Sequence, residues 1–509
     1  MLAPALMIQG TASSVGKSLI AAGLCRLFRQ QGLRVLPFKS QNMALNAFVT
    51  PEGGEIARAQ VVQAEAAGVA PHVDMNPILL KPERDAVSQV VVLGRPIGSM
   101  TAVEYHAYKP KLRDIIAGCL NRLRSRCDIL IIEGAGSPAE VNLKAHEIVN
   151  MHVARAADAR VLLLGDIDKG GVFAALVGTL ALLEPEERER VGGFIINKFR
   201  GDASLLAPGL EFLAARTGIP VVGVLPFVRG LRIADEDSVS LDHRGRNGRA
   251  GRDEIEIAVI RLPRISNYDD IQPLEHEPGV VVRFVESARE LAGADLVVLP
   301  GSKSTASDLA WMRETGIAEA IGARATRREP ILGLCGGCEM LGAEILDPDG
   351  IESAETTAMG LGLLPLRTRF ERTKITAQVG AVRATRSFLT DGLGDTTEVN
   401  GYEIHMGRVE LLPGAVPTFT LRSRNGERTE LPDGAVSFDG SVVGTMLHGI
   451  FENDVVRSGL LSALRRRRGL MEPAAPRAIP SKDAEYDRLA AMLWEHLDLP
   501  LLRRIAGLV

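Results

Sequence analysis

Residues 6–18 read LMIQGTASSVGKS, and this stretch decides the fold of the first half of the chain. An apolar run leads into Gly10, a loop of small residues follows, and Gly16-Lys17-Ser18 opens a stretch with helical periodicity. Backbone N–H groups of such a turn bind phosphate oxygens, the lysine neutralises the outer phosphates, and the serine hydroxyl can ligate magnesium. The stretch therefore predicts a phosphate-binding loop between a buried strand and a helix.

The spacing of this loop narrows the prediction. Five residues separate Gly10 from Gly16, whereas the usual phosphate loop has four. The longer loop resembles the variant of dethiobiotin synthetase and its relatives, which activate carboxylates with ATP. An ordinary glycine-rich turn with a chance lysine is the alternative, and the strand before and helix after the loop disfavour it. The predicted ATP-binding residues are Gly10, Thr11, Val15, Gly16, Lys17 and Ser18.

Short apolar runs continue beyond the loop and predict a parallel sheet. They lie at residues 5–8, 129–132, 161–164, 194–196 and 221–225. Runs of this kind fit strands buried on both faces, and helical patterns at residues 19–29 and 108–124 lie between them. The first part of the chain is therefore predicted to be a set of βαβ units, with helices covering the sheet.

A second α/β domain is predicted after a linker. Residues 243–254, HRGRNGRAGRDE, combine charges and small residues with no apolar partner for a core. New buried-strand signals follow at residues 255–260, 280–285, 296–299 and 331–334, with alternating patterns at 418–422 and 435–438 that suit antiparallel strands, and a helical stretch at 483–497. We predict a synthetase domain at 1–242, a linker at 243–254, a second domain at 255–455 and a C-terminal helical extension at 456–509.

Composition limits the possible partners and the compartment. The 59 Lys and Arg against 63 Asp and Glu give a net charge of −4, which disfavours a nucleic acid or an anionic membrane as partner. Five cysteines in 509 residues, with no apolar leader and no long apolar run, predict free thiols in a soluble, cytoplasmic protein.

Acidic residues at the predicted strand ends offer a magnesium site. Glu133 follows the strand at 129–132, and Asp166 and Asp168 follow the strand at 161–164. Because the carboxyl ends of parallel strands form the ligand crevice, these carboxylates are expected to face the triphosphate through Mg²⁺. The predicted metal ligands are Ser18, Glu133 and Asp166, with solvated loop carboxylates as the alternative.

Residues 331–342, ILGLCGGCEMLG, predict a nucleophile elbow at Cys335. Glycines beside the cysteine, between a strand and a helix, tolerate a strained backbone and expose the sulfur, and the helix N-terminus favours the thiolate. His448 follows in the stretch GTMLHGIF and could accept the thiol proton, so the order suits a cysteine nucleophile acting on an amide. The turn at residues 299–303 could supply a backbone donor that helps the Gly336 N–H to hold an oxyanion.

Two other interpretations remain open for these residues. Cys335 and Cys338 form a CxxC, which could be a redox pair or half of a metal site, although no second CxxC or pair of histidines completes a zinc set. A lone buried histidine is often structural, and the presence of the elbow favours a catalytic His448.

Together these segments resemble the cobyric acid synthase family of glutamine-hydrolysing enzymes in cobalamin biosynthesis, over nearly the whole chain. The segments that carry the resemblance are QGTASSVGKS, PFKSQNMALNA, IIEGAGSPAEVNL, GDIDKGGVFA, PGSKST, GLCGGCEMLG, GYEIHMG and GTMLHGIFEN. The resemblance implies a dethiobiotin-synthetase-like domain followed by a class I glutamine amidotransferase-like α/β domain. It also implies that ATP and Mg²⁺ activate carboxylates b, d, e and g of adenosylcobyrinic acid a,c-diamide, a corrinoid, for amidation.

In this family Cys335 would be the nucleophile that attacks glutamine and His448 its base. The chain departs from the family at Cys338 and Glu339, where an aromatic residue or leucine and then glutamine are usual. The His-x-Glu of class I amidotransferases is absent here, as in the family, so Glu403 or Glu452 is expected near the Cys–His pair. Lys39, Ser40, Gln41 and Asn42 are candidates to contact the corrinoid or ATP, or form a solvated loop.

Two rival functions are weighed against this one. Cobyrinic acid a,c-diamide synthase would perform the same chemistry on an earlier corrinoid, but the segments SQNMALNA and GDIDKGGVFA favour cobyric acid synthase. A P-loop switch ATPase with an inactive amidotransferase-like module is the rival from a different class. The presence of both Cys335 and His448 argues against it.

Overall fold

The computed structural model describes residues 2–84, 86–228, 230–233, 248–353, 356–471 and 480–508. The chain forms two compact units. Unit 1 comprises Met1–Ala44, Ile56–Glu236 and Pro480–Val509, and unit 2 comprises Leu45–Glu55 and Asp237–Ile479. Each unit therefore contains a segment that lies far away in the sequence from the rest of it.

Unit 1 is built on a six-stranded parallel sheet with the order β12-β11-β10-β1-β9-β2. Its strands are β1 (Ala5–Gly10), β2 (Val35–Phe38), β9 (Ile129–Glu133), β10 (Arg160–Asp166), β11 (Val191–Phe199) and β12 (Val221–Pro226). All side chains of β1 and β9 are buried, because helices cover both faces of such a sheet. The five strands predicted in this half are confirmed, and β2 is an addition.

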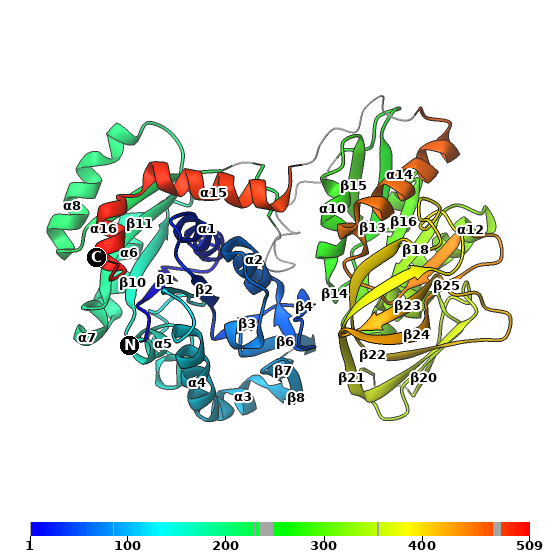
Figure 1. The fold of residues 1–509 in the computed structure, drawn as a ribbon, viewed down its shortest axis with the longest axis horizontal. Helices are drawn as coiled ribbons and strands as arrows, with labels where there is room; N and C mark the ends of the chain where they lie inside the picture. Colours follow the sequence, from blue (N-terminus) through cyan, green and yellow to red (C-terminus); the bar gives the residue numbers. More distant parts are fainter. Residues whose placement is uncertain are drawn as a thin grey trace. The chain divides into compact units, whose positions relative to one another are not determined.

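Helices follow the strands, as in βαβ units (Figure 1). They are α1 (Lys17–Gln30), α2 (Arg58–Ala67), α3 (Ala102–Tyr108), α4 (Arg113–Arg124), α5 (Met151–Ala156), α6 (Val172–Leu182), α7 (Pro185–Arg188) and α8 (Ala207–Thr217). The helix predicted at 108–124 begins only at Arg113. Residues Lys109–Leu112 form a 3-10 turn with a proline at its start, because Pro110 has no N–H to donate within a continuous helix.

The C-terminal helices return to unit 1. Helices α15 (Lys482–His496) and α16 (Leu499–Ile505) belong to the same hydrophobic core as α1 and the central strands. Figure 1 shows α15, in red, running past α1. A Cβ on Gly23 of α1 would lie 2.5 Å from the Leu493 Cδ1 atom of α15, so the two helices need a glycine to pack this closely. The chain end thus completes the core of the first unit.

A smaller sheet extends unit 1. Strands β3 (Gln41–Met43), β6 (Ile78–Arg84), β7 (Val87–Val92) and β8 (Arg95–Thr101) form it in that order, with β6, β7 and β8 joined antiparallel. The sequence does not predict this sheet, because apolar and polar residues do not alternate regularly along its short strands.

Unit 2 has its own mainly parallel sheet, with the order β15-β13-β16-β18-β26-β25. The strands are β13 (Ile255–Ile260), β15 (Val280–Val285), β16 (Leu296–Leu299), β18 (Ile331–Leu334), β25 (Ala435–Val436) and β26 (Val442–Thr445), and only β25 pairs antiparallel. The four buried strands predicted here are confirmed. The strand predicted at 435–438 ends at Val436, and Phe438 is exposed.

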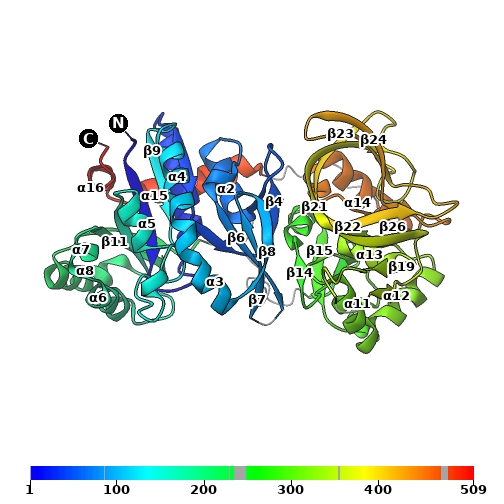
Figure 2. The same ribbon diagram turned by 90° about the horizontal axis from the view of Figure 1, so that it is seen from below.

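Unit 2 contains a second, largely antiparallel sheet. Its long strands are β21 (Leu366–Arg383), β22 (Glu398–Leu411), β23 (Phe419–Arg424) and β24 (Glu427–Asp433), with β19 (Glu344–Leu346) and β20 (Thr357–Met359) at the other edge. Figure 2 shows β23 and β24 on the side of unit 2 opposite to helices α11 (Thr305–Glu314) and α12 (Ile317–Thr326). Helices α13 (Gly336–Leu341) and α14 (Asp454–Arg468) complete the unit.

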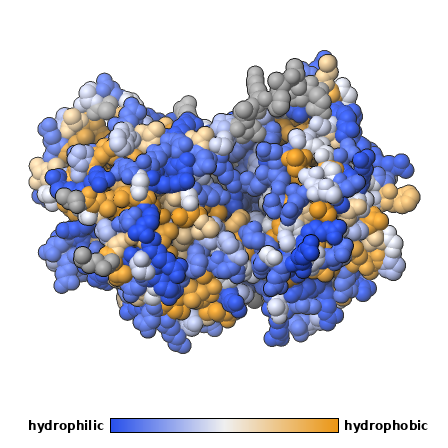
Figure 3. Space-filling view, viewed as in Figure 1, coloured by the Kyte–Doolittle hydropathy of each residue, from blue (hydrophilic) through white to orange (hydrophobic). Residues whose placement is uncertain are grey.

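The predicted extension at 456–509 is divided between the two units: α14 packs in unit 2, and α15 and α16 pack in unit 1. Residues 243–247 of the predicted linker lie outside the described residues, and residues 248–254 lead into β13. On the face drawn in Figure 3, hydrophilic residues dominate and apolar ones form separate patches. Among the described residues, no helix has the length and apolar character needed to cross a membrane.

Candidate functional site

The phosphate loop connects β1 to α1 and has the geometry that its sequence predicts. Gly16 has φ +104°, a conformation that favours glycine. A Cβ on Gly10 would lie 2.5 Å from Val15 Cγ2, so the loop folds tightly over the strand end. Lys17 is buried, and its Nζ donates to the carbonyl oxygens of Ala12 at 3.0 Å and Gly136 at 3.1 Å. These two hydrogen bonds hold the Lys17 ammonium between the loop and the segment after β9.

Two other predicted ATP-binding residues, Thr11 and Val15, make contacts within the fold of unit 1. The Thr11 N–H donates to the Leu164 carbonyl at 3.0 Å and so continues the β1–β10 pairing. The Val15 side chain is buried in the core. Its carbonyl accepts a hydrogen bond from Asn197 Nδ2 at 2.8 Å. Asn197, at the end of β11, was missed because a lone asparagine after a strand carries no specific signal in the sequence.

Glu133 lies at the centre of a buried polar cluster beside this loop. Its Oε1 accepts from the Ser18 hydroxyl at 2.7 Å and from Lys39 Nζ at 2.9 Å, and its Oε2 accepts from Gln63. The Lys39 and Glu133 side chains are 5% and 0% exposed, so the pair is shielded from water. The structure thus brings together Ser18 and Glu133, two of the three predicted metal ligands, and shows that Lys39 faces a carboxylate.

The aspartates after β10 are held by basic residues that the sequence analysis did not single out. Asp166 Oδ2 accepts from Lys198 Nζ at 2.8 Å, and the same Nζ donates to the Ser14 carbonyl of the phosphate loop at 2.7 Å. Asp168 forms an ion pair with Arg200 at 2.8 Å and is partly exposed. Lys198 therefore links Asp166 to the phosphate loop, whereas Asp168 is partly exposed.

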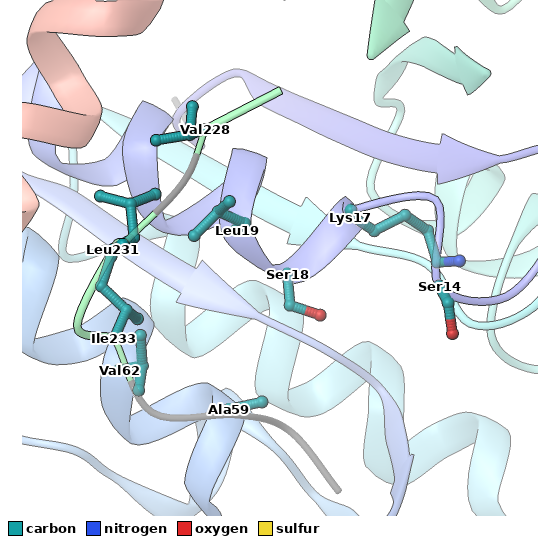
Figure 4. A pocket seen from close by; sticks show the side chains of 11 residues that line it. Ser14, Lys17, Ser18, Leu19, Ala59, Val62, Val228, Leu231 and Ile233 are labelled. Carbon is teal, nitrogen blue, oxygen red and sulfur yellow. The ribbon is translucent and has the colours of Figure 1, made fainter. Parts of the chain in front are cut away.

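A pocket of about 350 Å³ opens at the loop. Its polar end carries Ser14, Lys17 and Ser18, and its other end is apolar, as Figure 4 shows. The apolar lining comes from Leu19, Ala59, Val62, Val228, Leu231 and Ile233. A pocket with a phosphate-binding end and an apolar end suits a nucleotide or a phosphorylated ligand.

Cys335 in unit 2 has the strained backbone expected of a nucleophile elbow. Its φ of 48° and ψ of −112° are rare for a residue with a side chain, and it lies between β18 and α13. Its N–H donates to the Thr445 carbonyl at 2.8 Å, which ties the elbow to the neighbouring strand β26. The residue is 7% exposed. The strained turn predicted at Cys335 is confirmed, whereas the expected exposure of the residue is wrong, because the core of unit 2 buries it.

His448 is the titratable partner of Cys335, and Asp270 holds its other nitrogen. His448 Nδ1 lies 2.6 Å from Asp270 Oδ2, and Asp270 Oδ1 accepts from the Gly449 N–H at 2.7 Å. Burial lowers the pKa of His448, but the charges of Asp270 and Cys335 and their hydrogen bonds outweigh it and raise the pKa to about 10. The imidazolium form is therefore stabilised beside the sulfur, as a thiolate–imidazolium pair needs.

The residues expected beside this pair are placed differently. Glu403 pairs with Arg424, with Nη2 to Oε2 at 2.8 Å, and with His405 Nε2 at 3.4 Å. It lines a pocket of about 360 Å³ and is not the carboxylate on His448 Nδ1. Glu452 is exposed. The acid on the imidazole is Asp270, which the sequence analysis did not identify.

Tyr402 packs directly on His448. Its ring stacks on the His448 ring, with centroids 5.3 Å apart and planes 22° apart. The two residues also exchange backbone hydrogen bonds, Tyr402 N–H to His448 O at 3.1 Å and His448 N–H to Tyr402 O at 2.9 Å. A Cβ on Gly401 would lie 2.7 Å from the His448 carbonyl oxygen, so this approach requires glycine. The GYEIH stretch therefore supports His448.

The turn after β16 comes close to the elbow. Strand β17 (Gly301–Ser302) pairs with β14 (Ile265–Ser266). The Ser302 nitrogen lies 2.8 Å from the position that a Cβ on Gly336 would take, and a Cβ on Gly301 would lie 3.4 Å from His448 Cε1. The segment predicted to help an oxyanion hole is thus beside both Cys335 and His448, and its role as a donor stays a prediction.

The departure at Glu339 from the family's usual glutamine has a structural explanation, whereas nothing in the structure explains Cys338. All five cysteines are free, and among the described residues no group of three or more His, Cys, Asp or Glu could hold a metal. Glu339 is 2% exposed, and its Oε2 accepts from the Thr305 hydroxyl at 3.0 Å. Burial and the nearby charge of Glu352 raise the pKa of Glu339 to about 8. At neutral pH the side chain is therefore mostly a neutral acid, similar in shape to glutamine.

We expect Glu339→Gln to flatten the fall in stability with rising pH. The folded chain keeps a proton on Glu339 up to about pH 8, whereas the unfolded chain releases it near its ordinary value of 4.5. Between these values stability falls as pH rises, with a slope of up to about 1.4 kcal/mol per pH unit for one proton. Calorimetric melting of wild type and variant from pH 5 to 8 measures the difference.

Glu314→Gln is the matched control, because Glu314 is an exposed carboxylate at the end of α11. It should melt with the wild-type pH dependence. Equal slopes in wild type and Glu339→Gln would show that Glu339 is ionised in the folded chain.

Comparisons with known proteins agree with both halves of this description. Residues 6–241 match the family model described as a CobQ/CobB/MinD/ParA nucleotide binding domain. Residues 256–456 match the model described as a CobB/CobQ-like glutamine amidotransferase domain. The first contains the phosphate loop and Glu133, and the second contains Cys335, His448 and Asp270.

Three relatives that match the chain over nearly its whole length carry the same name. The chain is 63% identical to the cobyric acid synthase of Sorangium cellulosum, covering 100% of this chain and 99% of that one. It is 53% identical to that of Moorella thermoacetica (100% and 98%) and 52% identical to that of Dehalococcoides mccartyi strain ATCC BAA-2266 (98% and 97%). With this identity over the whole length, the chain belongs to the cobyric acid synthase family.

Proposed function

We propose that unit 2 releases ammonia from glutamine and that unit 1 uses ATP to amidate carboxylates of adenosylcobyrinic acid a,c-diamide. The observation that carries the proposal is the Cys335–His448–Asp270 arrangement in the same chain as a phosphate loop whose Ser18 bonds to Glu133. A glutaminase alone would not need the second site, and a nucleotide switch would not need the first.

In unit 2 the reaction begins with attack of the Cys335 thiolate on the amide carbon of glutamine. The negative charge passes to the amide oxygen, where the N–H groups near Gly336 and Ser302 would stabilise it. His448 then gives its proton to the leaving nitrogen, and ammonia departs to leave a thioester. Water, deprotonated by His448, hydrolyses the thioester to glutamate and restores the thiolate pair. Asp270 keeps the imidazole in one orientation throughout.

In unit 1 a substrate carboxylate attacks the γ-phosphorus of ATP, ADP leaves, and an acyl phosphate forms. Ammonia then attacks the acyl carbon, so that an amide forms, phosphate is released and a proton is lost to solvent. The buried Lys17 lies where it would balance the charge of the transferred phosphoryl group. The polar end of the 350 Å³ pocket would receive the phosphates and its apolar end the less polar part of the nucleotide.

The residues at the loop fit a magnesium ion. The Ser18 hydroxyl and the Glu133 carboxylate lie 2.7 Å apart, and both are the oxygen ligands that Mg²⁺ prefers. Since Mg²⁺ usually keeps several waters and phosphate oxygens, one carboxylate and one hydroxyl suffice from the protein. When bound, the ion neutralises charge on the phosphates. Asp166, which pairs with Lys198, remains a further candidate ligand.

The relatives' shared name favours cobyric acid as the product. The resemblance of the sequence segments implies adenosylcobyrinic acid a,c-diamide as substrate and side chains b, d, e and g as the sites of amidation. Five free cysteines favour a reducing compartment, and we place the enzyme in the cytoplasm. The earlier corrinoid, cobyrinic acid, is the substrate to be distinguished, because its amidation needs the same two chemistries.

Incubation of the purified chain with each corrinoid, glutamine and MgATP tests the proposal. We expect adenosylcobyrinic acid a,c-diamide to lose about one mass unit per amidation, as an oxygen and a proton are replaced by an NH₂ group, with one glutamate and one ADP released each time. Removal of Mg²⁺ with a chelator should stop ADP release. Amidation of cobyrinic acid instead, or glutamate release without any corrinoid product, would contradict the substrate assignment.

A further inference from the structure

A segment from the N-terminal half of the sequence is built into unit 2. Residues Leu45–Glu55, here called the arm, belong to unit 2 although the residues on both sides belong to unit 1. The arm contains β4 (Ala47–Val49), which pairs with β5 (Glu55–Ala57) and contacts β21 and β22. No part of the proposed chemistry assigns it a role.

Several side chains of β21 anchor the arm. Lys374 Nζ forms an ion pair with Glu55 Oε2 at 2.6 Å, and the two side chains are 6% and 0% exposed. The Thr376 hydroxyl donates to the Gly53 carbonyl at 2.7 Å, and Gln378 Nε2 donates to the Val49 carbonyl. Both charges are shielded from water, so removing either partner would leave the other charge buried and unpaired. The arm is therefore fixed along its length, unlike a solvated loop.

Ala47, near the start of the arm, contacts a residue that helps to hold Asp270. The Ala47 N–H donates to Asn267 Oδ1 at 3.0 Å. Asn267 is 2% exposed, has φ 51°, and caps the 3-10 turn Tyr268–Ile271 that contains Asp270. Its carbonyl accepts from the Asp270 N–H at 3.1 Å. One residue of the arm therefore helps to fix the turn that presents the carboxylate to His448.

Ala47 and Phe48 also contact Tyr402, the residue that stacks on the His448 ring. The Tyr402 hydroxyl donates to the Ala47 carbonyl at 3.2 Å. The Phe48 ring packs against the Tyr402 ring, with centroids 4.9 Å apart and planes 59° apart. Because Tyr402 in turn stacks on His448, Phe48 and Ala47 limit where that tyrosine, and hence the imidazole, can move.

We propose that the arm is a positioning element of the glutaminase site, in which Phe48 and the Ala47 backbone hold Tyr402 against His448 and Asn267 beside Asp270. The inference rests on the proposed glutaminase activity of unit 2. It adds Phe48 and Tyr402 as positioning residues, which act through His448 and do not touch the reacting atoms.

Phe48→Ala in the full chain tests this inference. We expect the kcat of glutamate release, measured with MgATP and the corrinoid, to fall about tenfold to a hundredfold, because a catalytic group displaced by about an ångström costs a factor of this size. The KM for glutamine should stay within about twofold, since uniform binding is untouched. Phe48→Tyr should restore most of the rate, because it retains the ring.

The pH dependence gives a second measurement. A looser contact between His448 and Asp270 stabilises the imidazolium less, so the alkaline limb of the kcat profile, where the imidazolium is lost, should move to lower pH in Phe48→Ala. A variant that merely folds less well would scale the profile without moving it. Synthesis from free ammonia should be unchanged, and Phe438→Ala, which truncates a fully exposed ring of unit 2, is the matched control.

Different failures separate the two proposals. Absence of glutamate release by the wild type would overturn the proposed glutaminase itself. An active wild type with Phe48→Ala equal to it in kcat and pH profile would overturn the positioning role. A change confined to the KM for glutamine would overturn it too, since it would make the arm part of substrate binding.

Discussion

Cys335→Ala is expected to abolish amidation with glutamine while leaving amidation with free ammonia intact. The Cys335 sulfur is the proposed nucleophile, and loss of the nucleophile from comparable catalytic sets lowers kcat on the order of 10⁶-fold. The phosphate loop lies in a different unit, so its chemistry should continue when ammonia is supplied. Glutamate release, ADP release and corrinoid mass, measured with each nitrogen source, give the result.

Cys338→Ala is the control for this experiment. Cys338 is buried beside Gly444, with no exposed sulfur, and burial raises its pKa well above the ordinary value. The variant should keep glutaminase activity. If Cys338→Ala fails as completely as Cys335→Ala, the two thiols act together and the redox interpretation of the CxxC gains support. If Cys335→Ala keeps glutamine-dependent activity, the assigned nucleophile is wrong.

Asp270→Asn should lower the kcat of glutamine hydrolysis on the order of 10³- to 10⁴-fold, the size of effect seen when an orienting carboxylate is lost from a triad. The amide can still bond to His448 Nδ1, but it holds the wrong tautomer and carries no charge. Because the Asp270 charge raises the pKa of His448, its loss should lower that pKa. The imidazolium then persists only to lower pH, so the alkaline limb of the kcat profile, where the imidazolium is lost, moves to lower pH.

Glu452→Gln is a suitable comparison, since Glu452 follows His448 closely in sequence and is exposed. We expect its rate to stay within about twofold of the wild type, as for most surface substitutions. The rate of Cys335 alkylation by iodoacetamide as a function of pH reports the thiolate directly. An unchanged alkylation profile in Asp270→Asn would contradict the role given to Asp270.

The parts of both sites that are contiguous in the sequence were predictable from it. The phosphate loop and the cysteine elbow each depend on a few neighbouring residues between a strand and a helix, so their spacing carries the geometry. The buried strands were predictable for a similar reason, because a strand covered on both faces must be apolar. Glu133 followed from its place at a strand end.

The parts that depend on contacts between distant segments were not predictable. Asp270 is 178 positions from His448, and the sequence offers only a pair of acids between the buried Tyr268 and Ile271 as a hint. That hint is useful in retrospect, since two carboxylates in an apolar stretch need a buried partner. Tyr402 resembles any aromatic residue on a strand. The arm was not predictable either, because the residues that hold it, on β21, on β22 and at Asn267, are more than 200 positions away in the sequence.

The return of α15 to unit 1 has a consequence for biosynthesis. Domains generally fold as units while the chain emerges from the ribosome, with the N-terminal one first. Here Leu489 and Leu493, which fill the core against α1, are translated after all of unit 2. The ATP-binding half therefore stays incomplete until all of unit 2 has been translated, and a nonsense codon anywhere in the glutaminase half would remove part of the core of both halves.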